Sequence, residues 1–199
     1  MLDALIVGGD SLVGAALFRR LHGAGEDVVA TTRRASPVSF PRMFSLDLRY
    51  PRPLPAARVT YLLAGVTNFR AIEENLYEAA QINVVGNLVV ADSQFHKGGR
   101  VVFLSSSSAE HVPLYWHGKL KLMTEQCLRT ALGDNVAIVR CGPIMMPGRD
   151  CYPDRDYQPI GLSALVDYLS AFMVNDWLSG LHKVWNGPHV FCGRERLAA

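Results

Sequence analysis

The feature that most constrains the fold is the stretch 5–14, in which an apolar run meets a turn of small residues. Leu5, Ile6 and Val7 predict a buried strand, and the apolar spacing after Ser11 predicts a helix. Glycine between them lets the backbone come close to a ligand, because it has no Cβ and adopts positive φ at little cost. The start of the helix adds unpaired amide N–H groups and the positive end of the helix dipole, which suit a pyrophosphate. The candidate binding residues of this turn are Gly8, Gly9, Asp10, Ser11, Leu12 and Gly14.

The small residues of the turn have the spacing Gly8-x-x-Ser11-x-x-Gly14, so a serine stands at the middle position of the usual three-glycine pattern. Serine is small enough to keep the approach to a ligand open. A glycine-rich turn between any strand and helix is the alternative interpretation. The place of the turn at the start of an alternating α/β chain favours the nucleotide-binding interpretation.

The composition restricts the class of protein. The chain has 199 residues, of which 49% are hydrophobic and 19% charged, and this predicts one globular domain over residues 1–199. The formal net charge of +2 is too small to indicate nucleic acid or an anionic membrane as a partner. The four cysteines and six histidines show no metal-ligand spacing, so we expect no metal site and reduced thiols, as in the cytoplasm. We also expect no signal peptide and no membrane-spanning segment.

Strand-like and helix-like segments alternate along the chain. Strands are predicted at about residues 5–7, 27–32, 43–46, 59–63, 100–104, 136–140 and 189–192, and helices at 11–21, 73–96, 115–131 and 162–178. Residues 142–157 are loop-like. This alternation predicts an α/β fold of the Rossmann type: a doubly wound, mostly parallel sheet with helices on both faces.

The predicted second strand ends in Thr31-Thr32-Arg33-Arg34. In dinucleotide-binding folds, an acidic residue near the end of this strand binds the ribose hydroxyls of adenosine, whereas arginine there accommodates a 2′-phosphate. Because no carboxylate stands here and two guanidinium groups do, Arg33 and Arg34 favour NADP over NAD as the cofactor. A pair of solvated surface arginines is the alternative.

Together with later landmarks, the turn resembles that of the extended short-chain dehydrogenase/reductase family, which includes nucleotide-sugar epimerases, dehydratases and reductases. The resemblance covers nearly the whole chain and depends on landmarks that follow one another in the family's order. They are Val7-Gly8-Gly9-Asp10-Ser11-Leu12-Val13-Gly14, Asp47-Leu48, Leu63-Ala64-Gly65, Asn83-Val84-Val85-Gly86-Asn87, Phe103-Leu104-Ser105-Ser106-Ser107 and Arg140-Cys141-Gly142-Pro143. The resemblance implies that Asp47 and Leu48 meet the adenine. It also implies cofactor-binding positions at Ala64, Gly65, Asn83 and Pro143.

The same resemblance implies a catalytic tyrosine four residues before a lysine, on one face of a helix. The lysine favours the phenolate, and the phenol moves a proton while a hydride moves to or from the cofactor. Tyr115 with Lys119 has the literal spacing. Lys121, followed by Glu125 four positions later, matches the family's continuation and places His117 at the tyrosine position. The two pairs point about 200° apart on an ideal helix, so only one can face the nicotinamide; the alignment favours His117 and Lys121, and both registers stay open.

Ser107 is the best match to the serine that hydrogen-bonds the reacting oxygen in this family, and Ser106 is the next. A serine-rich strand end with locally satisfied hydroxyls is the alternative. Only seven residues separate Ser107 from Tyr115, and the substrate-side region at about residues 142–182 is short. A reduced region of this kind predicts a small or shallow substrate pocket, or none.

These observations predict an NADP-dependent oxidoreductase or epimerase/dehydratase-like enzyme that acts on a carbonyl or alcohol group of a small molecule such as a nucleotide sugar. The displaced tyrosine leaves a second interpretation, an NAD(P)-binding sensor or scaffold without turnover. A structural subunit with an empty fold is a third, which the glycine turn, Arg33 and Arg34 disfavour. Helices at about residues 81–96 and 115–131 resemble those through which the family dimerises, so we expect a homodimer.

Overall fold

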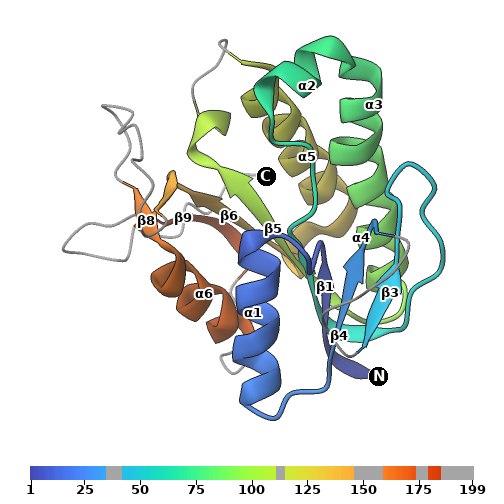
Figure 1. Cartoon of the computed structure of the whole chain (residues 1–199). Helices are drawn as coiled ribbons and strands as arrows, with labels where there is room; N and C mark the ends of the chain where they lie inside the picture. The colour runs from blue at the N-terminus through green and yellow to red at the C-terminus, as the bar shows by residue number, and fades with distance from the viewer. Residues whose placement is uncertain (35–41, 111–114, 146–158, 174–178, 185–199) are drawn as a thin grey trace.

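The computed structural model describes residues 1–34, 42–110, 115–145, 159–173 and 179–184. Its centre is a seven-stranded parallel sheet with the strand order β3-β2-β1-β4-β5-β6-β9 (Figure 1). From β1 the chain builds outward through β2 and β3, and it then returns to the other side of β1 at β4. This topology confirms the predicted doubly wound α/β fold. The strands are β1 (Leu2–Val7), β2 (Val28–Thr32), β3 (Met43–Ser45), β4 (Ala57–Leu62), β5 (Arg100–Ser106), β6 (Val136–Cys141) and β9 (Gly180–Val184).

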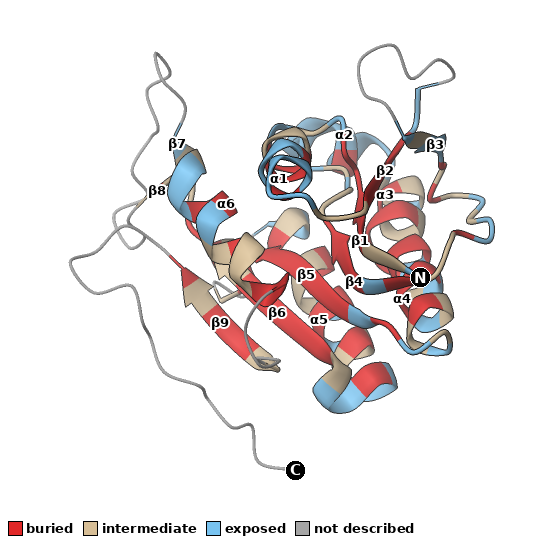
Figure 2. Ribbon diagram, turned by 90° about the horizontal axis from the view of Figure 1, so that it is seen from below, coloured by how far each residue is buried: buried red, intermediate tan, exposed pale blue. Residues whose placement is uncertain are grey.

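Helices cover both faces of the sheet (Figure 1). Helices α1 (Leu12–Gly23) and α6 (Leu162–Ser170) pack on one face, and α4 (Asn87–Phe95) and α5 (Trp116–Leu132) on the other. Successive side chains of a strand point to opposite faces. Ile6 of β1 therefore belongs to the core beneath α1 and α6, whereas its neighbours Leu5 and Val7 belong to the core beneath α4 and α5. Figure 2 shows the result: the central strands are buried, and exposed residues lie on the outer helices and loops.

The segment predicted as one helix over residues 73–96 is divided in the structure. Helix α2 (Phe69–Glu74) ends at Asn75, whose backbone leaves the helical region at φ −145° and ψ 76°, and α3 (Leu76–Ala80) begins after it. The cause is local, because the Asn75 side chain accepts a hydrogen bond from Glu78 N (3.1 Å) and caps the new helix. A π-helical segment, Gln81–Gly86, then leads into α4. A Cβ at Gly86 would lie 2.3 Å from Leu48 O, so this segment packs directly on the turn after β3.

The C-terminal third of the chain differs most from the prediction. Strand β7 (Ile144–Met145) lies in the segment predicted as a loop, and it pairs with β8 (Ile160–Gly161), which lies between that segment and the predicted helix. Pro143 O accepts a hydrogen bond from Ile160 N (2.9 Å) at the start of this small sheet. Strand β5 runs to Ser106 instead of Leu104, and α6 ends at Ser170, before a short 3-10 turn over 171–173. Strand β9 is absent from the prediction. Residues 174–178 of the predicted helix and the predicted strand 189–192 lie outside the described residues.

Candidate functional site

Two glycines shape the turn after β1. Gly8 adopts φ +92°, which side-chain-bearing residues rarely adopt, and a Cβ there would lie 2.8 Å from Ala64 N. Gly14, in the first turn of α1, faces the carbonyl of Gly8, and a Cβ there would lie 2.1 Å from that oxygen. A side chain at either position would push α1 away from β1 or from the loop after β4. The glycines therefore keep the N-terminus of α1 next to the carboxyl ends of the central strands.

Ser11 occupies the middle position of the turn as the cap of α1. Its hydroxyl donates to Gly8 O (2.7 Å) and accepts from Gly14 N (3.0 Å). A helix leaves its first N–H groups without an intrahelical partner, and Ser11 satisfies the one at Gly14. The N–H groups of Leu12 and Val13 are left to a ligand or to water. The serine thus fixes the turn while the turn keeps its capacity to bind an anion.

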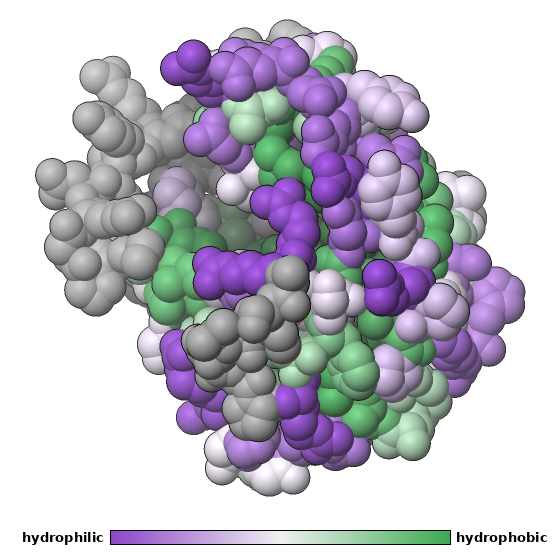
Figure 3. All heavy atoms as spheres, turned by 45° about the vertical axis from the view of Figure 1, so that its right-hand side comes forward, coloured by the Kyte–Doolittle hydropathy of each residue, from purple (hydrophilic) through white to green (hydrophobic). Residues whose placement is uncertain are grey.

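A cavity of about 620 Å³ opens at the carboxyl ends of β1, β2 and β4. This is the switch point of the sheet, where doubly wound folds bind their ligands. Figure 3 shows hydrophilic residues gathered round a hollow in which hydrophobic residues are visible. The predicted cofactor residues that line the cavity are Gly8, Asp10, Ser11, Arg33, Asp47, Leu48, Ala64 and Gly65. Those outside its lining are Gly9, Leu12, Gly14, Arg34, Asn83 and Pro143.

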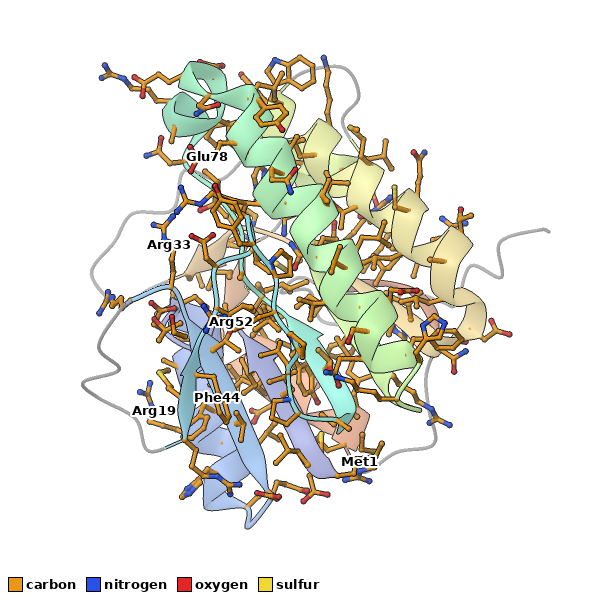
Figure 4. The ribbon with its side chains drawn as sticks, turned by 90° about the vertical axis from the view of Figure 1, so that its right-hand side faces the viewer. Met1, Arg19, Arg33, Phe44, Arg52 and Glu78 are labelled. Atoms are coloured by element: carbon orange, nitrogen blue, oxygen red, sulfur yellow. The ribbon has the colours of Figure 1, made fainter. Side chains whose placement is uncertain are left out.

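The two arginines after β2 have different surroundings. Arg33 lines the cavity and lies below Glu78 of α3 in Figure 4. Arg34 donates from its backbone N–H to Thr32 Oγ1 (3.1 Å), and its Nε lies 3.6 Å from Asp10 Oδ2. The Thr32 hydroxyl donates to the same Asp10 oxygen (2.8 Å). The end of β2 is thereby fixed against the glycine turn, with one guanidinium in the cavity lining and the other paired to a lining carboxylate.

Asp47 is held by an arginine two residues further along the chain. The Arg49 guanidinium donates to the Asp47 carboxylate from Nε (3.1 and 3.0 Å) and from Nη2 (2.6 Å), and its Nη1 donates to Glu78 Oε1 (3.1 Å). The hydrogen bonds from Arg49, and to a smaller extent the charge of Arg33, hold the pKa of Asp47 below its usual 3.8. Asp47 is therefore ionised at neutral pH and serves as a hydrogen-bond acceptor.

Asn83 supports the loop after β4 from outside the cavity lining. Its Oδ1 accepts from Val66 N (2.7 Å), and its Nδ2 donates to Val66 O (2.9 Å). A Cβ at Gly65 would lie 2.9 Å from Asn83 Oδ1, so the glycine lets this support come close. The backbone carbonyl of Asn83 accepts from Thr124 Oγ1 of α5 (3.0 Å). Asn83 therefore ties the cavity-lining loop to α5.

Sequence reasoning missed the part of the cavity lining that comes from α2, α3 and the residues next to them. It consists of Thr67, Asn68, Ala71, Asn75, Glu78, Ala79 and Ile82. The available signal was a pair of asparagines, Asn68 and Asn75, each of which accepts from the N–H three residues later and caps a helix. That pattern predicts where helices start. It does not predict that the helices face a ligand.

Helix α5 presents the two candidate catalytic pairs to different surroundings. Tyr115 precedes the helix and is 60% exposed, and Lys119 Nζ lies 4.5 Å from the centre of the exposed Trp116 ring. Lys121 turns toward the end of β5, where its Nζ donates to Leu104 O (2.7 Å). Burial lowers the pKa of Lys121 from 10.5 to about 8. The structure therefore brings Lys121 to the serine-bearing strand and leaves Lys119 beside Trp116.

His117 contacts the serine turn that follows β5. Its Nδ1 lies 3.1 Å from Ser108 Oγ, and that hydroxyl donates to Ser106 Oγ (2.9 Å). Burial, with a smaller effect from the charge of Lys121, lowers the pKa of His117 from 6.5 to about 4, so the imidazole is neutral at pH 7. Ser107, the predicted substrate-orienting serine, is buried at 7% exposure. Ser108, which sequence reasoning did not single out, is the serine in contact with His117.

A buried ion-pair network lies at the carboxyl end of β5 and joins it to α5, β6 and β9. Ser105 Oγ donates to Glu125, whose carboxylate accepts from Arg140 Nε (2.9 Å) and Nη2 (2.6 Å). Arg140 Nη1 also donates to Glu110 (3.1 Å), and Lys183 Nζ lies 2.9 Å from the same Glu110 oxygen. Although burial raises the pKa of Glu110, the hydrogen bonds from Lys183 and Arg140 lower it overall. The network fixes the frame on which the serine turn sits.

The groups around the cavity fit the adenosine and pyrophosphate parts of a dinucleotide. The unpaired amides at the start of α1 suit a pyrophosphate, and the ionised Asp47 suits an amino group. Arg33 and Arg34 suit a phosphate, and the volume is that of a small-molecule site. Within the described ranges, no helix is long and apolar enough to cross a membrane, and no group of three or more His, Cys, Asp or Glu residues is placed to hold a metal ion.

The fold and the cavity define a Rossmann-type nucleotide-binding protein. The model of the NAD dependent epimerase/dehydratase family matches residues 4–113, which is more than half of the chain. The chain therefore belongs to this family, in agreement with the resemblance seen in its sequence. No curated protein is similar enough in sequence to count as a match.

Solved structures share the fold at low sequence identity. MoeE5 in complex with UDP-glucose and NAD has a TM-score of 0.78 and 22% identity, covering 93% of this chain and 76% of that chain. The dTDP-4-dehydrorhamnose reductase of Bacillus anthracis in complex with NADP has a TM-score of 0.72 and 16% identity, covering 94% and 75%. The UDP-glucose 4-epimerase of Thermotoga maritima with UDP-glucose has a TM-score of 0.75 and 14% identity, covering 92% and 76%. These likenesses show the fold of this chain.

Proposed function

We propose that this protein is an NADP-dependent oxidoreductase or epimerase/dehydratase-like enzyme that acts on a carbonyl or alcohol group of a nucleotide sugar. The observation that carries the proposal is the cavity at the switch point of the sheet, with the anion-binding turn and Arg33 in its lining. The similar structures contain NAD, NADP or UDP-glucose, and a second MoeE5 structure contains UDP-glucuronic acid with NAD; these ligands support the proposed classes of cofactor and substrate.

In this proposal the cofactor is held along the carboxyl ends of β1, β2 and β4. The N–H groups of Leu12 and Val13 bind the pyrophosphate, since the helix provides them with no partner. Arg33 and Arg34 pair with the 2′-phosphate. The ionised Asp47 accepts from the amino group of adenine, and Leu48 packs beside the ring.

The groups proposed for the chemistry lie on α5 and on the serine turn. NADP, when bound, supplies or accepts the hydride. His117 is neutral at pH 7 and accepts the proton of the substrate hydroxyl, and Ser108 orients that hydroxyl from its contact with His117 Nδ1. Lys121, one helical turn after His117, holds the nicotinamide ribose from its place beside Leu104 O. Tyr115 with Lys119 is the alternative pair, with Ser107 as the alternative serine.

The cofactor assignment is tested by fluorescence titration with NADPH and with NADH. NADPH is expected to bind at least about tenfold more tightly, because the 2′-phosphate gains charge-assisted hydrogen bonds. The double variant R33A/R34A is expected to lose this preference while its affinity for NADH stays unchanged. R52A is the matched control, since Arg52 lies outside the cavity lining. Equal affinity for the two cofactors would contradict the NADP assignment, and absence of binding would contradict the cofactor site.

The catalytic register is tested by turnover with NADPH and a panel of nucleotide sugars. H117A is expected to lower kcat by about a hundredfold or more, and Y115F to leave it within about twofold. NADPH affinity should stay unchanged in both variants, which separates chemistry from binding. The reverse result would assign the chemistry to Tyr115 and Lys119.

A catalytically silent NADPH-binding sensor or scaffold is the second candidate function. His117 favours it, because a buried imidazole with a pKa of about 4 is a weaker acid–base group at neutral pH than one near 7. Tight NADPH binding with no oxidation or epimerisation across the same panel is the outcome expected of a sensor. Turnover that depends on His117 or on Tyr115 would exclude it.

We also propose that two copies of the chain associate through a surface formed by the π-helical segment, α4 and α5. Val85, Val89 and Met123 are 43%, 46% and 46% exposed on the π-helical segment, α4 and α5, and these exposed apolar side chains support an interface there. Light scattering should give a dimer for the native protein and a monomer for V89E. A native monomer would contradict the proposal.

A further inference from the structure

Arg49 joins two segments of the cavity lining that are distant in the sequence. From the turn after β3, its guanidinium binds Asp47 with Nε and Nη2, while Nη1 reaches Glu78 Oε1 on α3 at 3.1 Å. Asp47 and Glu78 both line the cavity. All three side chains are partly exposed, so the ion pairs lie at the rim of the cavity and not in the core.

The helix that carries Glu78 starts at a break in the backbone and continues, with helical backbone angles at Ala80 and Gln81, into the π-helical segment. Helix α3 has five residues, begins after the break at Asn75 and ends where the π-helical segment starts. Asn75 Nδ2 donates to Glu78 Oε2 (3.0 Å), so the carboxylate has one oxygen bound to its own helix cap and the other to Arg49. Glu78 therefore lies in the first turn after the break, where a helix lacks part of its own hydrogen bonding, and the position of this helix end depends on contacts such as these.

We propose that Arg49 and Glu78 form a latch that holds α3 over the adenosine half of the bound dinucleotide and sets how fast the dinucleotide leaves. The latch rests on the proposed binding of NADPH in this cavity. Arg49 acts as a positioning residue: its fork orients the Asp47 carboxylate, and its remaining nitrogen holds α3. A lysine could not do both, because it lacks the planar fork that binds two carboxylates at once.

The latch should change the rate at which the ligand dissociates more than the rate at which it associates. Asn75, Glu78 and Ala79 line the cavity, so movement of α3 opens its wall. Loss of the ion pair makes that movement easier, and dissociation of the ligand accelerates while association is little changed. Because the pair is partly exposed, salt weakens it. High salt should therefore accelerate dissociation from the native protein more than from a variant that lacks the pair.

The test is the dissociation rate of NADPH, measured by stopped-flow fluorescence on the full chain. E78Q removes the charge and keeps the shape of Glu78 and the Arg49–Asp47 contact. The expected result is a koff about two- to fivefold higher, with kon within about twofold. The affinity for 2′,5′-ADP, which carries the adenosine half alone, should fall by the same factor. The matched control is E74Q, because Glu74 pairs with Arg70 Nε (2.7 Å) on the neighbouring α2 and lies outside the lining.

The outcomes separate the latch from the proposed function. An unchanged koff for E78Q, with NADPH binding intact in the native protein, overturns the latch and leaves the function standing. A lower Tm for E78Q with an unchanged koff assigns the pair a structural role and overturns the latch as well. If the native chain binds neither NADPH nor 2′,5′-ADP, the proposed function fails and the latch fails with it.

Discussion

The sheet has an open side, which is the half around β1, β2 and β4, and a closed side, which is the half around β5, β6 and β9. These two sides use polar groups in opposite ways. Around β1, β2 and β4, polar groups line an open cavity, and the amides at the start of α1 remain available to a ligand. Around β5, β6 and β9, the charged groups bind one another: the side chain of Glu125 is 1% exposed and that of Arg140 is 11% exposed. The first side is built to receive a charged ligand, whereas the second satisfies its own charges. In the proposed function, binding and chemistry therefore depend on separate supports, and variants should affect them separately.

Removal of a cation from the closed side is expected to have the largest effect on stability. R140M leaves the Glu125 carboxylate buried without its partner, and breaking such a pair costs about 3–5 kcal/mol. Urea unfolding measures the loss, and NADPH affinity of the folded protein should be unchanged. The matched control is R58M, since the Arg58 side chain is 51% exposed and its pairs are worth about 1 kcal/mol or less. Equal losses in the two variants would contradict the contrast between the two sides.

The variant G14A, which adds a methyl group at Gly14, tests the open side of the sheet. Its Cβ would lie 2.1 Å from Gly8 O, so α1 must shift, at a cost of about 2 kcal/mol and a loss of at least about tenfold in NADPH affinity. Gly23, in the same helix, has nothing within 4 Å of an added Cβ, so G23A should be neutral or slightly stabilising. Urea unfolding and calorimetric titration measure the two effects. Unchanged NADPH binding by G14A would show that the turn is not the pyrophosphate site.

His117 is expected to give the smallest effect at neutral pH, where its imidazole is uncharged, and its contribution becomes visible as a pH dependence of stability. The pKa is 6.5 for the unfolded chain and about 4 for the folded one, so between these values the unfolded chain binds more protons. Stability should therefore fall as the pH is lowered from 7 to 4, by about 3 kcal/mol from this residue. H117F removes that contribution and flattens the curve of unfolding free energy against pH. Parallel curves for the native protein and H117F would contradict the burial of a neutral imidazole.

Prediction from sequence succeeded where a structure depends on neighbours in the chain. The apolar run before Gly8, the β-branched run before Arg33 and the glycine turn each define their own element, and the structure confirms these elements. The division of the helix at Asn75 was missed, because the apolar spacing of the segment continues across the break. Strand β9 was missed because His182 and Lys183 interrupt its apolar pattern. His182 is buried there because its Nδ1 lies 2.8 Å from the Tyr168 hydroxyl, a contact between distant residues.

The sequence by itself determined the α/β class, the nucleotide-binding turn and the two arginines after β2, because strand alternation, glycine geometry and charge are local properties. Only the tertiary structure decided that Lys121 turns toward β5 while Lys119 lies against Trp116, and that Ser108 is the serine beside His117. It also decided that Arg49 reaches Glu78 across the cavity rim. These contacts depend on how α3, α5 and the strand ends pack, and spacing along the chain does not define the direction in which a helix face meets its neighbours.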